Sequence, residues 1–96
     1  MAEYVRVATF EADDAALERL VEEIKAGGGP PPDLPAKSVT VVADRAKGEA
    51  RVITRFGSEE DLRKGSVTLD AMSPGGGNIR RISVESFEVV HEEHAP

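Results

Sequence analysis

The sequence predicts an α+β domain in which a four-stranded antiparallel sheet carries two helices on one face. Apolar residues alternate with polar ones in four short segments, as in half-buried strands, and recur at helical spacing in two others. Along the 96 residues these segments come in the order strand, helix, strand, strand, helix, strand. That order defines a split β-α-β arrangement, and the length suits one domain over residues 1–96.

The first half of the predicted fold is a strand over residues 4–10 followed by a helix over residues 14–26. In the strand, β-branched residues alternate with a second set of side chains, namely Tyr4, Arg6, Ala8 and Phe10. Asp13 and Asp14 provide an N-cap and negative charge for the first turn of the helix. Three glycines and three prolines then end the helix, so we expect a loop through Pro35.

The second half is predicted to be a hairpin, a helix and a last strand. Residues 38–43 and 51–56 are rich in β-branched side chains, and the polar stretch between them contains a turn-forming glycine. Ser58 and Asp61 resemble a capping box that opens a helix reaching about Met72. Gly65 and Ser66 leave a patch of small side chains on the helix side that faces the core. The last strand alternates over residues 79–90.

This order predicts a ferredoxin-like sheet with the first and third strands in the centre and the fourth beside the first. We expect six valines to face the helices: Val5, Val7, Val39, Val41, Val52 and Val84. The opposite face then carries apolar and charged groups, namely Tyr4, Phe10, Val42, Ile53, Phe87, Val89, Arg6, Arg51, Arg55 and Glu85. A cross-strand row of Glu85, Arg6 and Arg55 or Arg51 is expected there. Apolar groups surrounded by charges that can form ion pairs favour an interface with another chain. The alternative is a sheet face exposed to water.

Three segments resemble the dimeric α+β barrel superfamily, and within it the antibiotic-biosynthesis-monooxygenase-like group. They read Tyr-Val-Arg-Val-Ala-Thr-Phe at 4–10, Phe-Gly-Ser-Glu-Glu-Asp-Leu-Arg at 56–63 and Ser-Val-Glu-Ser-Phe-Glu-Val-Val-His-Glu at 83–92. The resemblance implies a homodimer in which two sheets pack face to face into a barrel with the helices outside. It also implies that cofactor-independent oxygenation of aromatic polyketides or quinols is one activity to consider.

Two functions of a homodimeric barrel therefore stay open, and a third possibility is an adaptor whose sheet edge or face binds a different protein. The chain is a homodimeric barrel that binds a small apolar ligand between sheet and helices, or it is a cofactor-independent monooxygenase acting on an aromatic quinol or polyketide-like substrate. The hydroxyls that face such a ligand are predicted to be those of Thr9, Thr54, Ser66 and Ser86. No residue among them is a strong general base, so no catalytic residue is assigned, and the residues imply no cofactor.

Other polar groups favour structural interpretations. His91 and His94 have the spacing of a weak metal site, but a solvated tail is favoured, and no metal is expected. Arg80 and Arg81 are expected to pair with acidic neighbours or with a partner chain; neutralising an anionic substrate is the alternative.

The net charge and the absence of cysteine narrow the classes of partner and compartment. Twelve basic against eighteen acidic side chains give a formal charge of -6, which repels nucleic acid and anionic membranes. There is no cysteine, and the N-terminal segment does not resemble a signal peptide, so a cytoplasmic location is expected. A chain of this size buries a small core, and association with a second copy would stabilise it.

Overall fold

The computed structural model describes residues 2–26, 34–70 and 79–95. Its elements are β1 (Glu3–Glu11), α1 (Asp14–Ala26), β2 (Ala36–Asp44), β3 (Glu49–Phe56), α2 (Glu59–Asp70) and β4 (Arg80–Val89). The predicted order is confirmed, and the bounds of the first helix are those predicted. Most of the predicted loop after α1, and the expected end of the second helix near Met72, lie outside the described residues.

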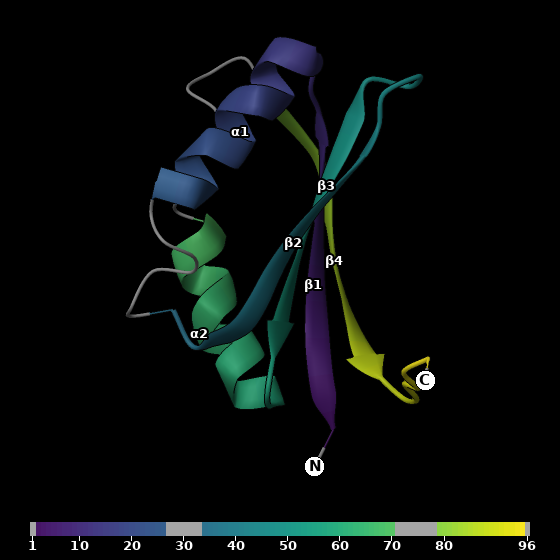
Figure 1. Ribbon diagram of the computed structural model, residues 1–96. Coiled ribbons are helices and arrows are strands. Elements are labelled where there is room, and N and C mark those ends of the chain that lie inside the picture. Colours follow the sequence, from purple (N-terminus) through teal and green to yellow (C-terminus); the bar gives the residue numbers. More distant parts are fainter. Residues whose placement is uncertain (1, 27–33, 71–78, 96) are drawn as a thin grey trace.

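The four strands form one antiparallel sheet in the order β2-β3-β1-β4, with both helices on the same side of it (Figure 1). The predicted central position of the first and third strands is therefore confirmed, and the fold is ferredoxin-like. β2 and β4 are the edge strands. The opposite side of the sheet carries no helix, and we call it the open face.

Both helices begin at the caps that the sequence predicts. The Asp13 carboxylate accepts a hydrogen bond from the Ala16 amide at 2.8 Å, and the Ser58 hydroxyl accepts one from the Asp61 amide at 3.1 Å. Each cap satisfies one of the amides that a helix leaves unpaired in its first turn. Gly48, in the turn between β2 and β3, has a φ of 67°, which a residue with a side chain rarely adopts.

The core consists of two hydrophobic clusters at opposite ends of β1. Four buried residues form the cluster at α1, with two partly buried ones against them: Ala12, Ala16, Leu17 and Ala50, with Val41 and Ile79. Three form the cluster at α2, with three partly buried ones: Leu34, Phe56 and Leu62, with Tyr4, Ala36 and Leu69. The β1–β3 register joins Tyr4 to Phe56 at one end and Phe10 to Ala50 at the other. The middle of the helix-covered face therefore belongs to neither cluster.

The face assignment of β1 is the main correction to the sequence analysis. Tyr4 packs in the cluster at α2 and Arg6 contacts Asp70 of α2, so the even-numbered residues of β1 face the helices. Val5 and Val7 therefore lie on the open face, and the prediction for this strand is wrong by one residue. The register places the named residues of the other strands on the predicted faces. A central strand has neighbours on both faces, so its two sets of side chains are similar in hydrophobicity and alternation gives little guidance.

Gly65 of α2 sits directly against the Phe56 ring. A Cβ atom at this glycine would lie 2.6 Å from Phe56 Cζ, closer still to Phe56 Cε1, and 3.3 Å from Leu34 Cδ1. Phe56 has no exposed surface, so its ring cannot turn away into solvent. The patch of small side chains on α2 therefore accommodates the Phe56 ring, and no empty space lies opposite Gly65.

We predict that Gly65→Ala destabilises the protein. Alanine favours the helix by about 1 kcal/mol, but overpacking against a fixed ring costs about 1–3 kcal/mol, and a contact this short puts the result at the upper end. Gly57→Ala is the matched control because its Cβ would meet only Lys37 Cδ at 3.7 Å, an ordinary contact. Chemical denaturation measures both free energies of unfolding. Equal stability of the two variants would contradict the packing described for Gly65.

Candidate functional site

A polar row crosses the helix-covered face between the two hydrophobic clusters. Arg6 of β1 pairs in register with Thr54 of β3 on one side and with Ser86 of β4 on the other. Arg6 is 4% exposed and Thr54 1% exposed, whereas Ser86 lies on an edge strand and is exposed. The row therefore runs from a solvent-exposed edge into the middle of the sheet, and its central member is a buried cation.

The charge of Arg6 is only partly matched. Its Nη2 donates to Asp70 Oδ1 at 2.5 Å, and Nη1 of Arg81 lies 3.4 Å from the same oxygen. Two guanidinium groups thus share one carboxylate oxygen. Within the part of the chain that the structure describes, Arg6 Nε and Thr54 Oγ1 are buried without a hydrogen-bond partner. Buried polar groups are nearly always paired, so these two unpaired atoms make the row a candidate binding position.

The structure brings together two of the four hydroxyls that we predicted for a ligand. Thr54 and Ser86 flank Arg6. Thr9 is buried, but the alternation of β1 turns it to the open face, where its register partners are Arg51 and Ser83. Ser66 is half-buried on α2. Sequence reasoning missed Arg6 as a site residue because the one-residue error in β1 placed it on the open face.

A shallow groove of about 440 Å³ lies elsewhere, between α1 and the edge strand β2. Its apolar lining comes from Leu17, Val21, Val41 and Ala43, and its rim is charged. None of the four predicted ligand residues lines this groove, and neither of the buried unpaired polar atoms of the described residues belongs to its lining. It is a surface depression beside the core and not the expected ligand site.

The open face is apolar in its middle and charged around it. Val42 and Phe87 are 42% and 49% exposed, and Val5, Val7 and Ile53 are half-buried or buried between them. Arg51 on β3 and Glu85 on β4 lie on either side of β1, opposite Thr9 and Val7 respectively. The expected charge row is wrong for Arg6, which lies on the other face, whereas Arg55, Arg51 and Glu85 are on the open face.

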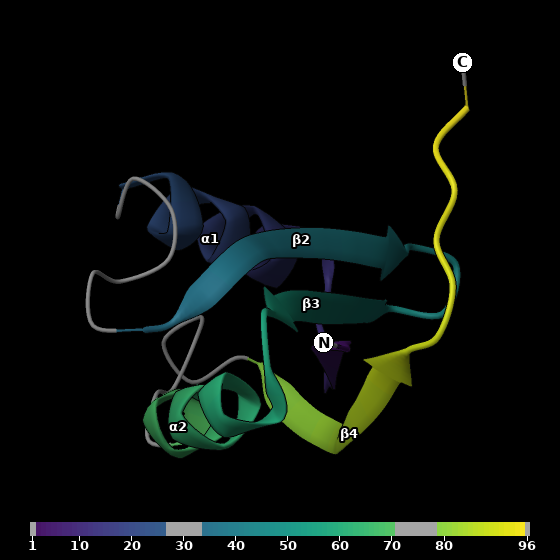
Figure 2. The same ribbon diagram turned by 90° about the horizontal axis from the view of Figure 1, so that it is seen from below.

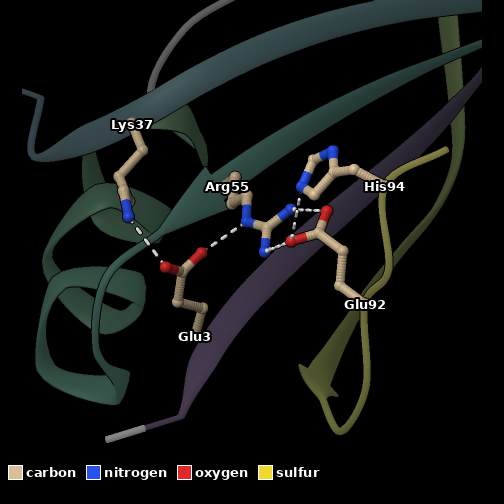
Figure 3. A network of polar contacts seen from close by, with 5 residues as sticks. All are labelled: Glu3, Lys37, Arg55, Glu92 and His94. Carbon is tan, nitrogen blue, oxygen red and sulfur yellow. Dashed lines mark hydrogen bonds and ion pairs between the residues drawn. The ribbon is translucent and has the colours of Figure 1, made fainter. Parts of the chain in front are cut away.

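Arg55 ties three parts of the chain together at one end of the open face (Figure 3). Its Nε donates to Glu3 at 2.5 Å, and its Nη1 and Nη2 donate to the two carboxylate oxygens of Glu92 at 2.7 Å each. Lys37 of β2 donates to the other oxygen of Glu3 at 2.7 Å. A bidentate guanidinium–carboxylate pair fixes geometry as well as charge. The segment after β4, which carries Glu92, is thereby held on the side away from the helices (Figures 1 and 2).

These contacts shift the pKa values of the charged groups. Hydrogen bonds from Lys37 and then Arg55 lower the pKa of Glu3, and the Arg55 hydrogen bonds lower that of Glu92. The pKa of Arg55 is raised, first by Glu92 and then by Glu3. All three shifts favour the charged forms of the groups in this network.

The remaining charged groups form local pairs. Arg80 lies 3.3 Å from Glu11 and Arg81 pairs with Asp70, so the expected pairing with acidic neighbours is confirmed. His91 contacts Glu93 at 2.8 Å, and His94 lies 3.9 Å from Glu92. Residues 2–26, 34–70 and 79–95 contain no group of three or more side chains placed to hold a metal ion. None of the helices within these ranges has the length and hydrophobicity to cross a bilayer.

The chain has distant similarity to several solved structures. No family model and no curated protein matches the chain. Among solved structures, Rv0793 from Mycobacterium tuberculosis is 16% identical with a TM-score of 0.49, covering 98% of this chain and 99% of that one. Uncharacterized protein TM1266 from Thermotoga maritima is 11% identical with a TM-score of 0.46, covering 91% and 95%. A "putative PII-like signaling protein" from Thermus thermophilus is 25% identical with a TM-score of 0.43, covering 94% of each chain.

We predict that the C-terminal segment detaches from Arg55 in acid. The pKa values of Glu3 and Glu92 in the network lie below their ordinary value of 4.5, so the attachment is complete above that pH. It is lost as the pH falls through the lowered values, because protonation removes the carboxylate charge. NMR relaxation of residues 91–95, followed from neutral to acidic pH, reports the detachment.

The matched variants for this experiment are Arg55→Met and Arg51→Met. Both remove one arginine from the open face of β3, but only Arg55 contacts Glu92. Arg55→Met should leave residues 91–95 mobile at every pH, and Arg51→Met should preserve the transition. A segment that stays equally ordered in both variants would show that Arg55 does not hold it.

Proposed function

We propose that the protein is a homodimeric α+β barrel domain in which the open faces of two copies pack together and each copy binds a small ligand on its helix-covered face. The observation that carries the proposal is the composition of the open face. A half-exposed Phe87 and a half-exposed Val42 border a continuous apolar middle. Exposed apolar surface bordered by charges is typical of an association surface. The resemblance to the dimeric α+β barrel superfamily supports the same arrangement.

A second copy complements this face in charge. Two sheets that pack face to face are related by a two-fold axis lying between them. An axis along β1 sets β3 of one copy against β4 of the other, which brings Arg51 towards Glu85 twice. Among the described residues Glu85 has no ion pair within its own chain. Arg51 has one long contact, 3.9 Å between its Nη2 and Glu49 Oε1. The two charges are thus available to a partner that presents the same surface.

The ligand space in this proposal is at the polar row on the helix-covered face. The clusters at α1 and α2 are closed by their own side chains, as the Phe56 ring against Gly65 illustrates. Between them, Arg6 Nε and Thr54 Oγ1 are polar atoms without partners among the described residues. A ligand that is largely apolar, with one polar group, fits these surroundings better than a wholly apolar one.

The monooxygenase is the second candidate, and Arg6 is the observation that favours it. Oxygenation without a cofactor requires a deprotonated, electron-rich substrate, and a buried guanidinium stabilises such an oxyanion. If the protein has this activity, it consumes oxygen in the presence of hydroquinones or anthrones, and Arg6→Met abolishes the consumption. A flat oxygen trace with every substrate in the panel would exclude the activity for those substrates.

We predict that charge substitutions on the open face control dimerisation. Phe87→Glu puts a carboxylate into the interface and weakens association at least about tenfold, because the buried charge has no partner. Arg51→Glu places two carboxylates opposite each other across the proposed interface, and Glu85→Arg places two guanidinium groups there. Each single variant should weaken the dimer. The double variant exchanges the two charges and should recover most of the wild-type affinity.

Sedimentation equilibrium measures the dissociation constants of all four variants and the wild type. Ser86→Glu, on the same strand as Phe87 but on the other face, is the control and should leave the dimer intact. A wild-type chain that stays monomeric at micromolar concentration would overturn the dimer. A dimer insensitive to Phe87→Glu would place the interface elsewhere.

A further inference from the structure

We propose that Asp70 occupies the anion position of the ligand site and that a ligand carboxylate displaces it from Arg6. The proposal rests on the ligand site proposed above and names both the chemistry of the ligand and the group that competes with it. The ligand is a small, largely apolar molecule with one carboxylate. Asp70 is then an internal substitute that neutralises Arg6 while the site is empty.

The two partners of the Arg6–Asp70 contact differ in burial. The Arg6 side chain is 5% exposed and fixed in the middle of the sheet, whereas that of Asp70 is 56% exposed at the last residue of α2. Only one oxygen of Asp70 contacts Arg6, although a guanidinium binds a carboxylate best through two parallel hydrogen bonds. The buried partner is therefore enclosed by its neighbours, whereas the exposed partner can turn into solvent, where water hydrates its carboxylate.

The sharing of one Asp70 oxygen also favours displacement. Nη2 of Arg6 and Nη1 of Arg81 both contact Asp70 Oδ1, so one oxygen serves two guanidinium groups. A carboxylate that offers both of its oxygens satisfies the two groups better. When Asp70 swings out, a carboxylate from another molecule can take its place without the restraint of the helix.

The unpaired atoms define what the ligand must offer. Arg6 Nε is a donor and the Thr54 hydroxyl donates or accepts, so an oxygen with negative charge satisfies both. Arg81, whose side chain is 42% exposed beside Asp70, adds a second positive charge at the solvent side of the row. Two guanidinium groups and one hydroxyl around a single displaceable carboxylate form a binding site for one organic anion. Metal cations and neutral hydrocarbons do not match it.

Benzoate is a suitable probe because it joins one carboxylate to a small apolar ring, and benzamide is its neutral counterpart. Titration calorimetry should show benzoate binding at least about tenfold tighter than benzamide, since a hydrogen bond to a charged group is worth more than one to a neutral group. Arg6→Met should abolish the preference, and Thr54→Val should weaken benzoate binding about threefold or more.

Asp70→Asn gives the most specific readout. It removes the competing carboxylate and should tighten benzoate binding about threefold or more while lowering the thermal stability of the ligand-free protein, because Arg6 loses its counter-charge. A purely structural Asp70 predicts the loss of stability without the gain in affinity. Glu60→Gln is the matched control: it removes the same charge from the same helix, at an exposed residue paired with Lys64. An equal gain in Glu60→Gln would show an effect of net charge alone and would overturn the proposal.

Other outcomes are equally decisive. Failure of benzoate to bind both the wild type and Asp70→Asn, or equal affinity for benzoate and benzamide, overturns the anion site. If Arg6→Met does not fold, as judged by circular dichroism, Asp70→Asn and Thr54→Val decide the question. Sedimentation of the same samples separates the two proposals: a monomer that binds benzoate through Arg6 refutes only the dimer, and a dimer that binds no benzoate refutes only the site.

Discussion

The need to accommodate one buried positive charge dominates the helix-covered side of this sheet. A guanidinium removed from water requires counter-charge and hydrogen-bond acceptors, and Arg6 has a single carboxylate oxygen for this purpose among the described residues. The two hydrophobic clusters lie at either end of β1 and leave the middle to Arg6 and Thr54. The helices follow this division, since each covers one cluster.

The two faces of β1 differ in charge, because only one of them carries Arg6. The even-numbered side chains include Arg6 of the polar row and Tyr4 of the cluster at α2, and the odd-numbered ones contribute Val5 and Val7 to the open face. Neither face of this central strand is mainly polar. A ferredoxin-like chain of this kind therefore leaves an apolar face uncovered, and packing against an identical face is the simplest way to remove it from water.

Local signals in the sequence predicted local structure well, and long-range contacts were beyond them. Asp13 marks where α1 begins, because capping depends on neighbouring residues. The face of β1 depends instead on long-range contacts, among them the packing of Tyr4 on α2 and the contact of Arg6 with Asp70, sixty-four positions away. Likewise, nothing near Glu92 indicates that it pairs with Arg55 across the open face. The polar row was therefore predicted in part, through Thr54 and Ser86, but its central charge was assigned to the wrong side.

Adjacent residues of β3 connect the two proposed surfaces. Thr54 belongs to the polar row, and Arg55, the next residue, holds the C-terminal segment on the open face. A pleated strand turns neighbouring side chains to opposite faces, so a shift of β3 that brings Thr54 closer to a ligand also moves Arg55 relative to Glu3 and Glu92. Because Glu3 lies on β1, two positions from Val5 and three from Arg6, both central strands join the polar row to the ion network. The proposed binding on the helix-covered face and the proposed packing on the open face therefore involve the same pair of strands.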